Sequence, residues 1–440
     1  MIEQLIFTVI SITALTFALK QFWQIRQKIK LGRPEKIEGD TGTRLKNVLL
    51  IAFGQKKMFK QWGPALMHFF IYAAFLVTQI ELLEIFFDGV TGYHRAFAAS
   101  LGGFYTFIIS FIEILTAFAL VATIIFLLRR TVFSVARFQQ AEMKGWPSRD
   151  GILILVGELF LILGIVCMNG ADVVLQGLDP AHYPDTGTLA VSSWLGPMLF
   201  GGFTQGTLVV IERFGWWLHI LTVLAFLNYL PISKHLHIVL AFFNVYYSRL
   251  TPRGEMENMP DIMNEVKSMM GIGDAEEEVD MGAELPEFGV KDVFGLSWKN
   301  LLDAYSCTEC GRCTAQCPAN LTGKKLSPRK VMMDIRDRVE EVSATMSASK
   351  EPMTAENYDD GKSLFDYITP EELHACTTCQ ACVEACPVTI NPMEPILAMR
   401  RYEILTESKG PTDWIPMFTS VENNGAVWAV ADPRDGWTKE

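Results

Sequence analysis

The chain has 440 residues, of which 50% are hydrophobic, and its mean hydropathy is +0.22. Both values are high for a soluble protein of this length, so they indicate membrane-spanning segments. The formal net charge of -11 argues against nucleic acid as a partner, because phosphate binding needs clustered Lys and Arg. The length allows two or three domains, and the long apolar runs lie before residue 250.

Five apolar stretches are each long enough to cross a bilayer, which takes roughly 20 residues of helix. The first has no basic leader and no small-residue cleavage site after it, so we interpret it as a span rather than a signal peptide. The sequence therefore predicts a multi-pass protein of the cytoplasmic membrane of a bacterium or archaeon. The predicted spans are residues 4–20, 64–87, 103–128, 151–176 and 208–230.

The basic residues between the spans predict their orientation. Eleven Lys and Arg residues lie from the end of span one, Lys20, to Lys60, and five lie between spans three and four. The other two connections, residues 88–102 and 177–207, contain a single basic residue, Arg95. Because Lys and Arg accumulate on the cytoplasmic side, we expect the N-terminus outside and everything after the fifth span in the cytoplasm.

Histidines at membrane depth are candidate haem ligands. His68 lies near the cytoplasmic end of the second span, His219 lies within the fifth, and His235 and His237 follow Pro231. A lone histidine could simply hydrogen-bond a neighbouring helix, but two imidazoles from different helices are what a bis-histidine haem needs. If the fifth helix continues past Pro231, its 100° per residue places His237 on the face of His219 and His235 opposite.

These histidines lie in segments that resemble a known family. Residues 218–219 and 231–238 resemble the fifth span of the cytochrome b (gamma) subunit of respiratory nitrate reductase. Residues 67–70 resemble its second span, with His68 on the ligand position nearest the cytoplasm. The resemblance implies one haem b held between His68 and His237.

The resemblance leaves His219 without an evident partner, because the family's other ligand on the second span corresponds to Thr78. A second haem would need a histidine from elsewhere, such as His94 or His182 in the outer connections. One haem b is therefore expected and a second is left open, with His219 and His235 kept as candidate ligands.

Three carboxylates also lie at or near membrane depth, Glu81 and Glu84 in the second span and Glu113 in the third. Each could be an interfacial side chain that reaches water at a helix end. The alternative is a functional one, because buried charge in a membrane is costly without a purpose. We therefore expect these residues to relay protons or to contact a quinone near the outer face.

Composition changes sharply after the fifth span. From about residue 250 to 295 the chain is rich in Glu, Asp, Met and Gly and contains the acidic run 274–278. We interpret this segment as a solvated connector with a short helix, and an acidic docking site is the alternative. The predicted domains are a membrane haem domain (1–248), an acidic linker (249–295), a cluster-binding domain (296–405) and a tail that contacts another subunit (406–440).

Eight of the nine cysteines form two copies of the run C-x2-C-x2-C-x3-C, each followed by proline. A zinc site needs only four ligands and typically shows two separated pairs, so two complete runs indicate two [4Fe-4S] clusters. The fourth cysteine of each run ligates the other cluster in two-cluster proteins of this type. The predicted ligand sets are Cys307, Cys310, Cys313 and Cys386 for one cluster, and Cys376, Cys379, Cys382 and Cys317 for the other. The ninth cysteine, Cys167, is interpreted as a small buried hydrophobe.

The segment between the two runs has 58 residues and carries helix signals. Ser327 followed by Pro328 is a typical helix start, and apolar residues then recur at helical spacing. A second helical run, residues 396–405, follows Pro395. We therefore predict an all-α chain: a five-helix cytochrome b-like bundle and an α-helical ferredoxin-type domain.

The cysteine-containing half resembles the heterodisulfide-reductase-like iron-sulfur family. In fused relatives the tail would lead into cysteine-rich CCG repeats, whereas this chain ends at Glu440. The resemblance implies that the catalytic portion is a separate CCG-repeat, flavoprotein or dehydrogenase subunit, and that the quinone is menaquinone. The matching residues are Trp298-Lys299, 303–313, Pro387-Val388, Met417-Phe418, 422–425, Trp428, Arg434 and Trp437.

Together these features predict a subunit that passes electrons between a cytoplasmic redox partner and membrane quinone through two [4Fe-4S] clusters and haem b. No residue is assigned a catalytic role on a soluble substrate. A membrane-anchored iron-sulfur redox sensor or accessory ferredoxin is the alternative, but neither needs intramembrane histidines. A transporter would show internal repeats and broken helices, which the sequence lacks.

Overall fold

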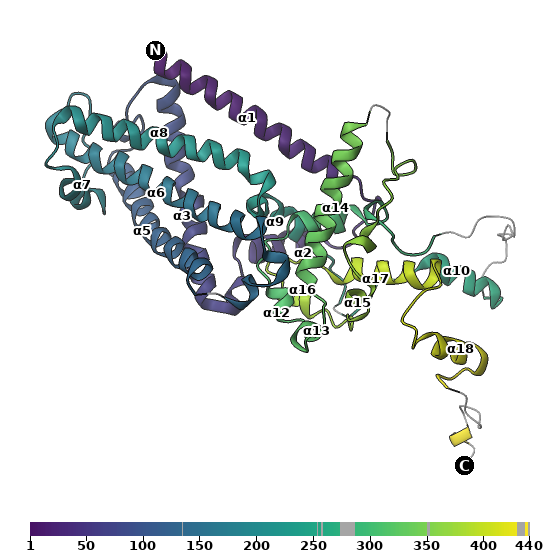
Figure 1. The fold of residues 1–440 in the computed structure, drawn as a ribbon. Helices are drawn as coiled ribbons and strands as arrows, with labels where there is room; N and C mark the ends of the chain where they lie inside the picture. Colours follow the sequence, from purple (N-terminus) through teal and green to yellow (C-terminus); the bar gives the residue numbers. More distant parts are fainter. Residues whose placement is uncertain are drawn as a thin grey trace. The chain divides into compact units, whose positions relative to one another are not determined.

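The computed structural model describes the chain except residues 134, 253, 257, 273–286, 350–352, 429–435 and 439–440. The described residues confirm the all-α prediction: they contain helices, one isolated bridge between Arg33 and Ser297, and no strand. The acidic run 274–278 and Arg434 lie outside the described residues. By internal packing the chain divides into two units, and each is described by itself (Figure 1).

The first unit comprises Met1–Gln27, Asn47–Phe243 and Thr308–Gly311. Within the described residues, five helices are long and apolar enough to cross a membrane, which confirms the five predicted spans. Two short helices, α4 (Ala98–Leu101) and α7 (Ser192–Phe200), lie in the connections. The long helices are α1 (Ile2–Ile29), α3 (Trp62–Thr91), α5 (Gly103–Thr131), α6 (Trp146–Leu178) and α8 (Gln205–Tyr229).

Local sequence signals explain where several of these helices begin and end. Helix α3 ends at Gly92, whose left-handed φ of 80° lets its N–H bond to the carbonyl of Asp88. Helix α8 begins after Thr204, whose hydroxyl accepts a hydrogen bond from the backbone N–H of Thr207. The remaining length of each helix is set by its uninterrupted apolar sequence.

Helices α3, α5, α6 and α8 pack side by side, in the order α3, α5, α6, α8 (Figure 1). Helix α1 joins them through Phe7, which packs in one core cluster with Ile85 and Trp216. The α6 and α8 backbones approach closely at Gly164 and Gly215, where an added Cβ would meet backbone atoms of the facing helix. Small residues that permit close approach are typical of helix pairs in membranes.

We expect Gly164→Ala to destabilise the membrane unit by about 1–3 kcal/mol, because overpacking forces neighbouring atoms apart. The new Cβ would lie 2.9 Å from the Cβ and the backbone nitrogen of His219. Gly177→Ala is the matched control, since Gly177 is also in α6 and has open space around the added atom. Thermal unfolding in detergent should show a lower Tm for the first variant alone, and equal Tm values would contradict this packing.

The assumption that the fifth helix continues past Pro231 to His237 does not hold. Helix α8 ends at Tyr229, two 3-10 turns follow, and α9 (His237–Tyr246) begins at His237 itself. The physical reasons are that Pro231 has no N–H to donate and that Ser233 is extended, with φ -122° and ψ 164°. The register argument that placed His235 opposite His237 therefore does not hold.

The second unit comprises Lys28–Lys46, Asn244–Cys307 and Arg312–Glu440. Helix α14 confirms the predicted start at Pro328, and the Ser327 hydroxyl accepts from the backbone N–H of Lys330. The short helix expected in the connector is α10. The helices of this unit are α2 (Thr41–Asn47, up to Lys46), α10 (Pro260–Met269), α11 (Trp298–Tyr305), α12 (Arg312–Ala315), α13 (Pro318–Leu321), α14 (Pro328–Ala348), α15 (Pro370–His374), α16 (Ala381–Ala385), α17 (Met393–Arg401) and α18 (Ile415–Asn424).

Short helices surround the cysteine runs in this unit. Helix α14 packs against α11 and α12, α12 packs against α16, and α15 packs against α17. Helix α17 begins three residues before the predicted run 396–405, because Pro395 fits within the first turn of a helix. The predicted run then ends in a π-helical turn, Tyr402–Thr406.

Candidate functional site

Four cysteines of the second unit line one cavity, which α13 and α16 border. Three of them, Cys376, Cys379 and Cys382, belong to the second run. The fourth is Cys317, the last cysteine of the first run, although 58 residues separate it from Cys376. The structure thus brings together the four residues that the crossed assignment places on one cluster.

The electrostatics of this cavity fit a positively charged metal centre. Burial and the neighbouring Cys376, Cys317 and Cys379 sulfurs raise the pKa of the Cys382 thiol to about 12. Burial also raises the pKa of Cys376. Four thiolates around one cavity would repel one another, and iron ions bound among them would offset that repulsion.

The two cysteine runs share a backbone conformation. The residue before the second cysteine of each run, Glu309 or Thr378, has a left-handed φ of 53° or 54°. The residue after that cysteine, Gly311 or Gln380, is also left-handed, with φ of 72° or 58°. Non-glycine residues rarely adopt this conformation, so its recurrence indicates that both runs curl around the same kind of group.

Of the other predicted ligand set, Cys307 and Cys386 are buried, whereas Cys310 and Cys313 are partly buried. The sulfur of Cys386 accepts a hydrogen bond from the backbone N–H of Ile390 at 3.3 Å. Cys376, which belongs to the other predicted ligand set, accepts a similar hydrogen bond from the backbone N–H of Thr378 at 3.4 Å. Cys167 lies in α6 and is half-buried.

Three of the candidate haem ligands are held in the same way. In His68, His219 and His237, Nδ1 lies within hydrogen-bond distance of a carbonyl or amide oxygen. Such oxygens only accept, so Nδ1 carries the proton and Nε2 keeps the lone pair that binds iron. The partners are the Gln55 side-chain oxygen for His68 (3.2 Å), the Leu161 carbonyl for His219 (3.1 Å) and the Lys234 carbonyl for His237 (2.6 Å).

His235 lies with His68 and His237. Its ring centroid is 6.2 Å from that of His237 and 5.8 Å from that of Phe226. Burial, together with the nearby His237 and His68, lowers the pKa of His235 to about 3, and burial lowers the pKa of His237 as well. His235 and His237 are therefore neutral, and the neutral form is the one that binds a metal.

His219 lies apart, on the α6–α8 contact. The histidines of the connections 88–102 and 177–207 have other partners. His94 has both ring nitrogens engaged, with Asp172 at 2.6 Å and Arg213 at 3.5 Å. His182 is 79% exposed and bonds to Asp179.

A buried lysine fixes the turn that carries His235 and His237. Lys234 donates from Nζ to the Glu309 carboxylate at 2.6 Å and to the Pro147 carbonyl at 2.6 Å. Glu309 precedes Cys310, and both lie in the segment Thr308–Gly311 that packs with the first unit. Since the carbonyl of the same Lys234 accepts from His237, one residue contacts both a candidate haem ligand and the first cysteine run.

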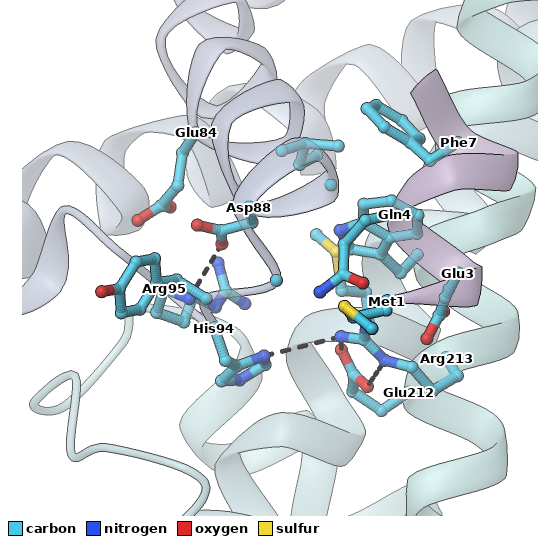
Figure 2. A pocket seen from close by; sticks show the side chains of 16 residues that line it. Met1, Glu3, Gln4, Phe7, Glu84, Asp88, His94, Arg95, Glu212 and Arg213 are labelled. Atoms are coloured by element: carbon cyan, nitrogen blue, oxygen red, sulfur yellow. Dashed lines mark hydrogen bonds and ion pairs between the residues drawn. The ribbon is translucent and has the colours of Figure 1, made fainter. Parts of the chain in front are cut away.

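A polar cavity of about 140 Å³ lies near the start of α1 and the end of α3, and α6 and α8 contribute to its lining (Figure 2). Its lining includes Glu84, Asp88, His94, Arg213 and Trp216. Roughly this volume is enough for one six-membered aromatic ring. The cavity thus combines an aromatic wall with several groups that can exchange protons.

Ion pairs fix the polar side chains of the cavity. Arg213 donates to both oxygens of Glu212 at 2.6 Å, and Figure 2 shows His94 directed toward Arg213. Arg95 also lines the cavity, and its guanidinium lies 3.6 Å from Glu81 and 3.6 Å from Asp172. Arg95, Glu81 and Asp172 are buried, and a protein tolerates buried charges only when they are paired.

The three predicted carboxylates occupy different positions in this region. Glu84 lines the cavity and accepts from the Tyr105 hydroxyl at 2.6 Å. Glu81 lies behind it against Arg95. Glu113 accepts from backbone N–H groups at the start of α7, at 2.7 and 3.2 Å, which is a structural arrangement.

Comparison with known proteins identifies the cysteine-containing region. Residues 306–390 match the family model described as the 4Fe-4S dicluster domain. This segment is therefore similar to domains that bind two iron-sulfur clusters. Such a domain would account for the eight clustered cysteines, all of which lie within the match.

Three curated relatives are named as oxidoreductases or a ferredoxin. A probable iron-sulfur-binding oxidoreductase, FadF, of Bacillus subtilis is 30% identical over 94% of this chain and 57% of its own length. An EtfAB:quinone oxidoreductase of Syntrophomonas wolfei is 26% identical over 100% of this chain and 60% of its own length. A probable membrane-anchored ferredoxin of Chromohalobacter salexigens is 36% identical over 28% of this chain and 20% of its own length.

The relatives are iron-sulfur oxidoreductases and electron carriers, and the chain spans less than two thirds of the length of the first two. No solved structure matches this chain. The similarity therefore supports electron transfer by an oxidoreductase subunit that contains a dicluster domain and membrane helices.

Most of the polar residues in and around this cavity were not predicted from the sequence. Asn169 and Asp172 lie within the fourth span, and Glu212 and Arg213 lie within the fifth, but none of them was singled out. Charged or amide side chains inside apolar runs were the available signal, because each is costly without a partner. Lys234 was missed as well, since a lysine just after a span is ordinary and its contact with Glu309 is 75 residues away in sequence.

Proposed function

We propose that the chain is a membrane-bound respiratory subunit that passes electrons between a cytoplasmic redox partner and menaquinone. The observation that carries the proposal is the shared geometry of His68 and His237: in both, Nδ1 lies within hydrogen-bond distance of an oxygen, which favours the tautomer that binds iron through Nε2. In the same chain, the dicluster domain supplies a second set of one-electron carriers. Two kinds of iron site in one protein are typical of electron-transfer chains.

A haem b held by His68 and His237 fits the residues present. Both imidazoles are half-buried and lie near a third neutral imidazole, His235. The Gln55 side-chain oxygen and the Lys234 carbonyl, which accept from Nδ1 of the two imidazoles, would fix the two ring orientations. When bound, the haem would supply a one-electron site within the apolar part of the chain.

For the clusters we propose crossed ligation. Cys317 would complete the site of Cys376, Cys379 and Cys382, and this is supported by the cavity that these four residues share. Cys386 would complete the site formed by the first three cysteines of the first run. Crossing ties two distant segments together, which is an arrangement that helps clusters exchange electrons.

The outer cavity is the proposed quinone site. A quinone gains or loses protons together with electrons, so its site needs groups that exchange protons at the ring oxygens. His94 lines the cavity, and its Nε2 lies 2.6 Å from Asp172, which would orient the imidazole. The similarity to an EtfAB:quinone oxidoreductase supports quinone as the substrate, and the basic inner segments support the outer face as the location.

We expect His94→Gln to slow the oxidation of a menaquinol analogue by about 10²- to 10³-fold, because the proton acceptor is removed. His182→Gln is the matched control, since His182 is an exposed histidine of another outer connection. Stopped-flow reduction of the protein by the quinol measures the rate. An unchanged rate in His94→Gln would move the quinone site elsewhere.

The donor side is proposed to be a separate CCG-repeat protein, flavoprotein or dehydrogenase. The tail helix α18 supports a role in subunit contact, because Ile415, Phe418 and Val421 are exposed. The similarity of part of the chain to a membrane-anchored ferredoxin favours a second candidate function, an accessory ferredoxin without quinone chemistry. Haem in the purified protein distinguishes the two, since the ferredoxin function needs none.

A further inference from the structure

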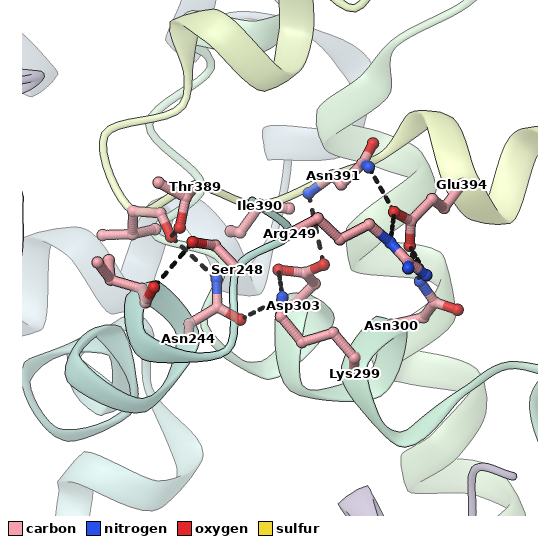
Figure 3. Close-up of polar contacts among 12 residues, drawn as sticks. Asn244, Ser248, Arg249, Lys299, Asn300, Asp303, Thr389, Ile390, Asn391 and Glu394 are labelled. Carbon is pink, nitrogen blue, oxygen red and sulfur yellow. Dashed lines mark hydrogen bonds and ion pairs between the residues drawn. The ribbon is translucent and has the colours of Figure 1, made fainter. Parts of the chain in front are cut away.

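The segment that follows Cys386 is held by a buried polar network within the second unit (Figure 3). This segment, Val388 to Asn391, brings the backbone N–H of Ile390 to the sulfur of Cys386 at 3.3 Å. Thr389, between the two, has a left-handed φ of 61°. A β-branched residue in that conformation costs on the order of 1–3 kcal/mol, so surrounding contacts must hold the turn.

Two side chains anchor the ends of the turn. Asn244 donates from its amide to the carbonyl of Val388 at 2.9 Å. At the other end, the carboxylate of Asp303 accepts from the backbone N–H of Asn391 at 3.4 Å. Both anchors are buried, with exposed fractions of 0% and 1%. They therefore fix the direction of the intervening N–H group of Ile390.

A single lysine connects the two anchors. Lys299 donates from Nζ to Asp303 at 2.7 Å and to the side-chain oxygen of Asn244 at 3.0 Å. Its side chain is 3% exposed. A buried ion pair of this kind contributes little net stability, and it is often kept for specificity of geometry. Figure 3 shows the pair lying between the end of α9 and the turn.

We propose that Asn244, Lys299 and Asp303 are positioning residues that hold the Ile390 N–H on Cys386 and thereby raise the reduction potential of the cluster that Cys386 ligates. The inference rests on the ligand assignment in the proposed function. A hydrogen bond to a cluster sulfur stabilises the reduced cluster, because reduction adds negative charge to the sulfurs. Weakening that bond therefore makes the cluster harder to reduce.

The test compares two variants of the full-length protein that leave the net charge unchanged. Asn244→Leu removes the anchor on Val388, and the double variant Lys299→Met with Asp303→Leu removes the other anchor together with its counter-ion. Buried ion pairs replaced in this way by apolar residues are often tolerated. Asn357→Leu is the control, because Asn357 holds an exposed loop at Thr354 that contains no cysteine.

Redox titration followed by electron paramagnetic resonance measures both clusters separately. We expect one cluster to shift to a more negative potential in both variants, with about threefold to tenfold less of it reduced at the wild-type midpoint. The other cluster and the control should be unchanged. Unshifted potentials with a lower Tm would show that the network is only structural and would overturn the proposal.

Two other outcomes also decide the matter. Loss of one cluster from both variants would contradict the proposal, which assigns the network an effect on potential and not on cluster retention. If the wild-type protein itself shows fewer than two clusters, the proposed function fails together with the inference. If the wild-type protein has both clusters, and one reduction potential shifts in the two variants but not in the control, the proposed function stands and the inference is supported.

Discussion

Replacing His237 by alanine is expected to remove haem b from the purified full-length protein and to leave both iron-sulfur clusters in place. His237 begins α9, and its Nδ1 is bound to the Lys234 carbonyl, so only Nε2 is available to iron. Loss of an axial ligand should lower haem content by roughly tenfold or more. A pyridine haemochrome assay measures the haem, and total iron with acid-labile sulfide measures the clusters.

The same loss is expected for His68→Ala, because the two imidazoles are proposed to bind one iron. His182→Ala is the control and should retain haem, since His182 is exposed and contacts Asp179. If either ligand variant keeps its haem, the haem lies elsewhere in the chain. His235→Ala separates the neighbours: it should retain haem, and a loss there instead of in His237→Ala would exchange their roles.

Replacing Cys317 by serine is expected to abolish the same cluster that Cys376→Ser abolishes. Both residues line one cavity, although they belong to different cysteine runs. Each variant should lose about half of the cluster iron and one of two electron paramagnetic resonance signals. The two single variants should therefore be spectroscopically alike.

Cys307→Ser and Cys386→Ser should in turn remove the other signal. Cys167→Ser is the control, because Cys167 lies in α6 and outside the dicluster domain. Crossed ligation would be wrong if Cys317→Ser removed the signal that Cys307→Ser removes. Such a result would assign each cluster to the cysteines of one run.

The sequence was sufficient to predict features that depend on composition or on short spacing. The five long helices follow from apolar runs, and α14 follows from Ser327 and Pro328. The cysteine runs indicated clusters because ligand spacing is local. That Cys317 lines the cavity of the second run agrees with a general rule about two-cluster proteins, on which the crossed assignment was based.

Features that depend on long-range contacts were not predictable. The sequence did not show that the helix ends at Tyr229 and does not continue to His237. The effect of Pro231 on a helix depends on whether surrounding contacts stabilise a turn. Asp150 provides such a contact, since it accepts from the backbone N–H of Lys234 at 3.0 Å. The outer cavity combines α1, α3, α6 and α8, and no local pattern shows that Arg95 and Asp172 meet.

The central claim is that this chain exchanges electrons with quinone through iron held by His68 and His237. The most direct measurement is the visible spectrum of the oxidised full-length protein, under anaerobic conditions, after addition of a soluble menaquinol analogue. The account predicts that the absorption bands of a reduced b-type haem appear. A spectrum without haem bands, with or without bleaching of the iron-sulfur absorption, would contradict it.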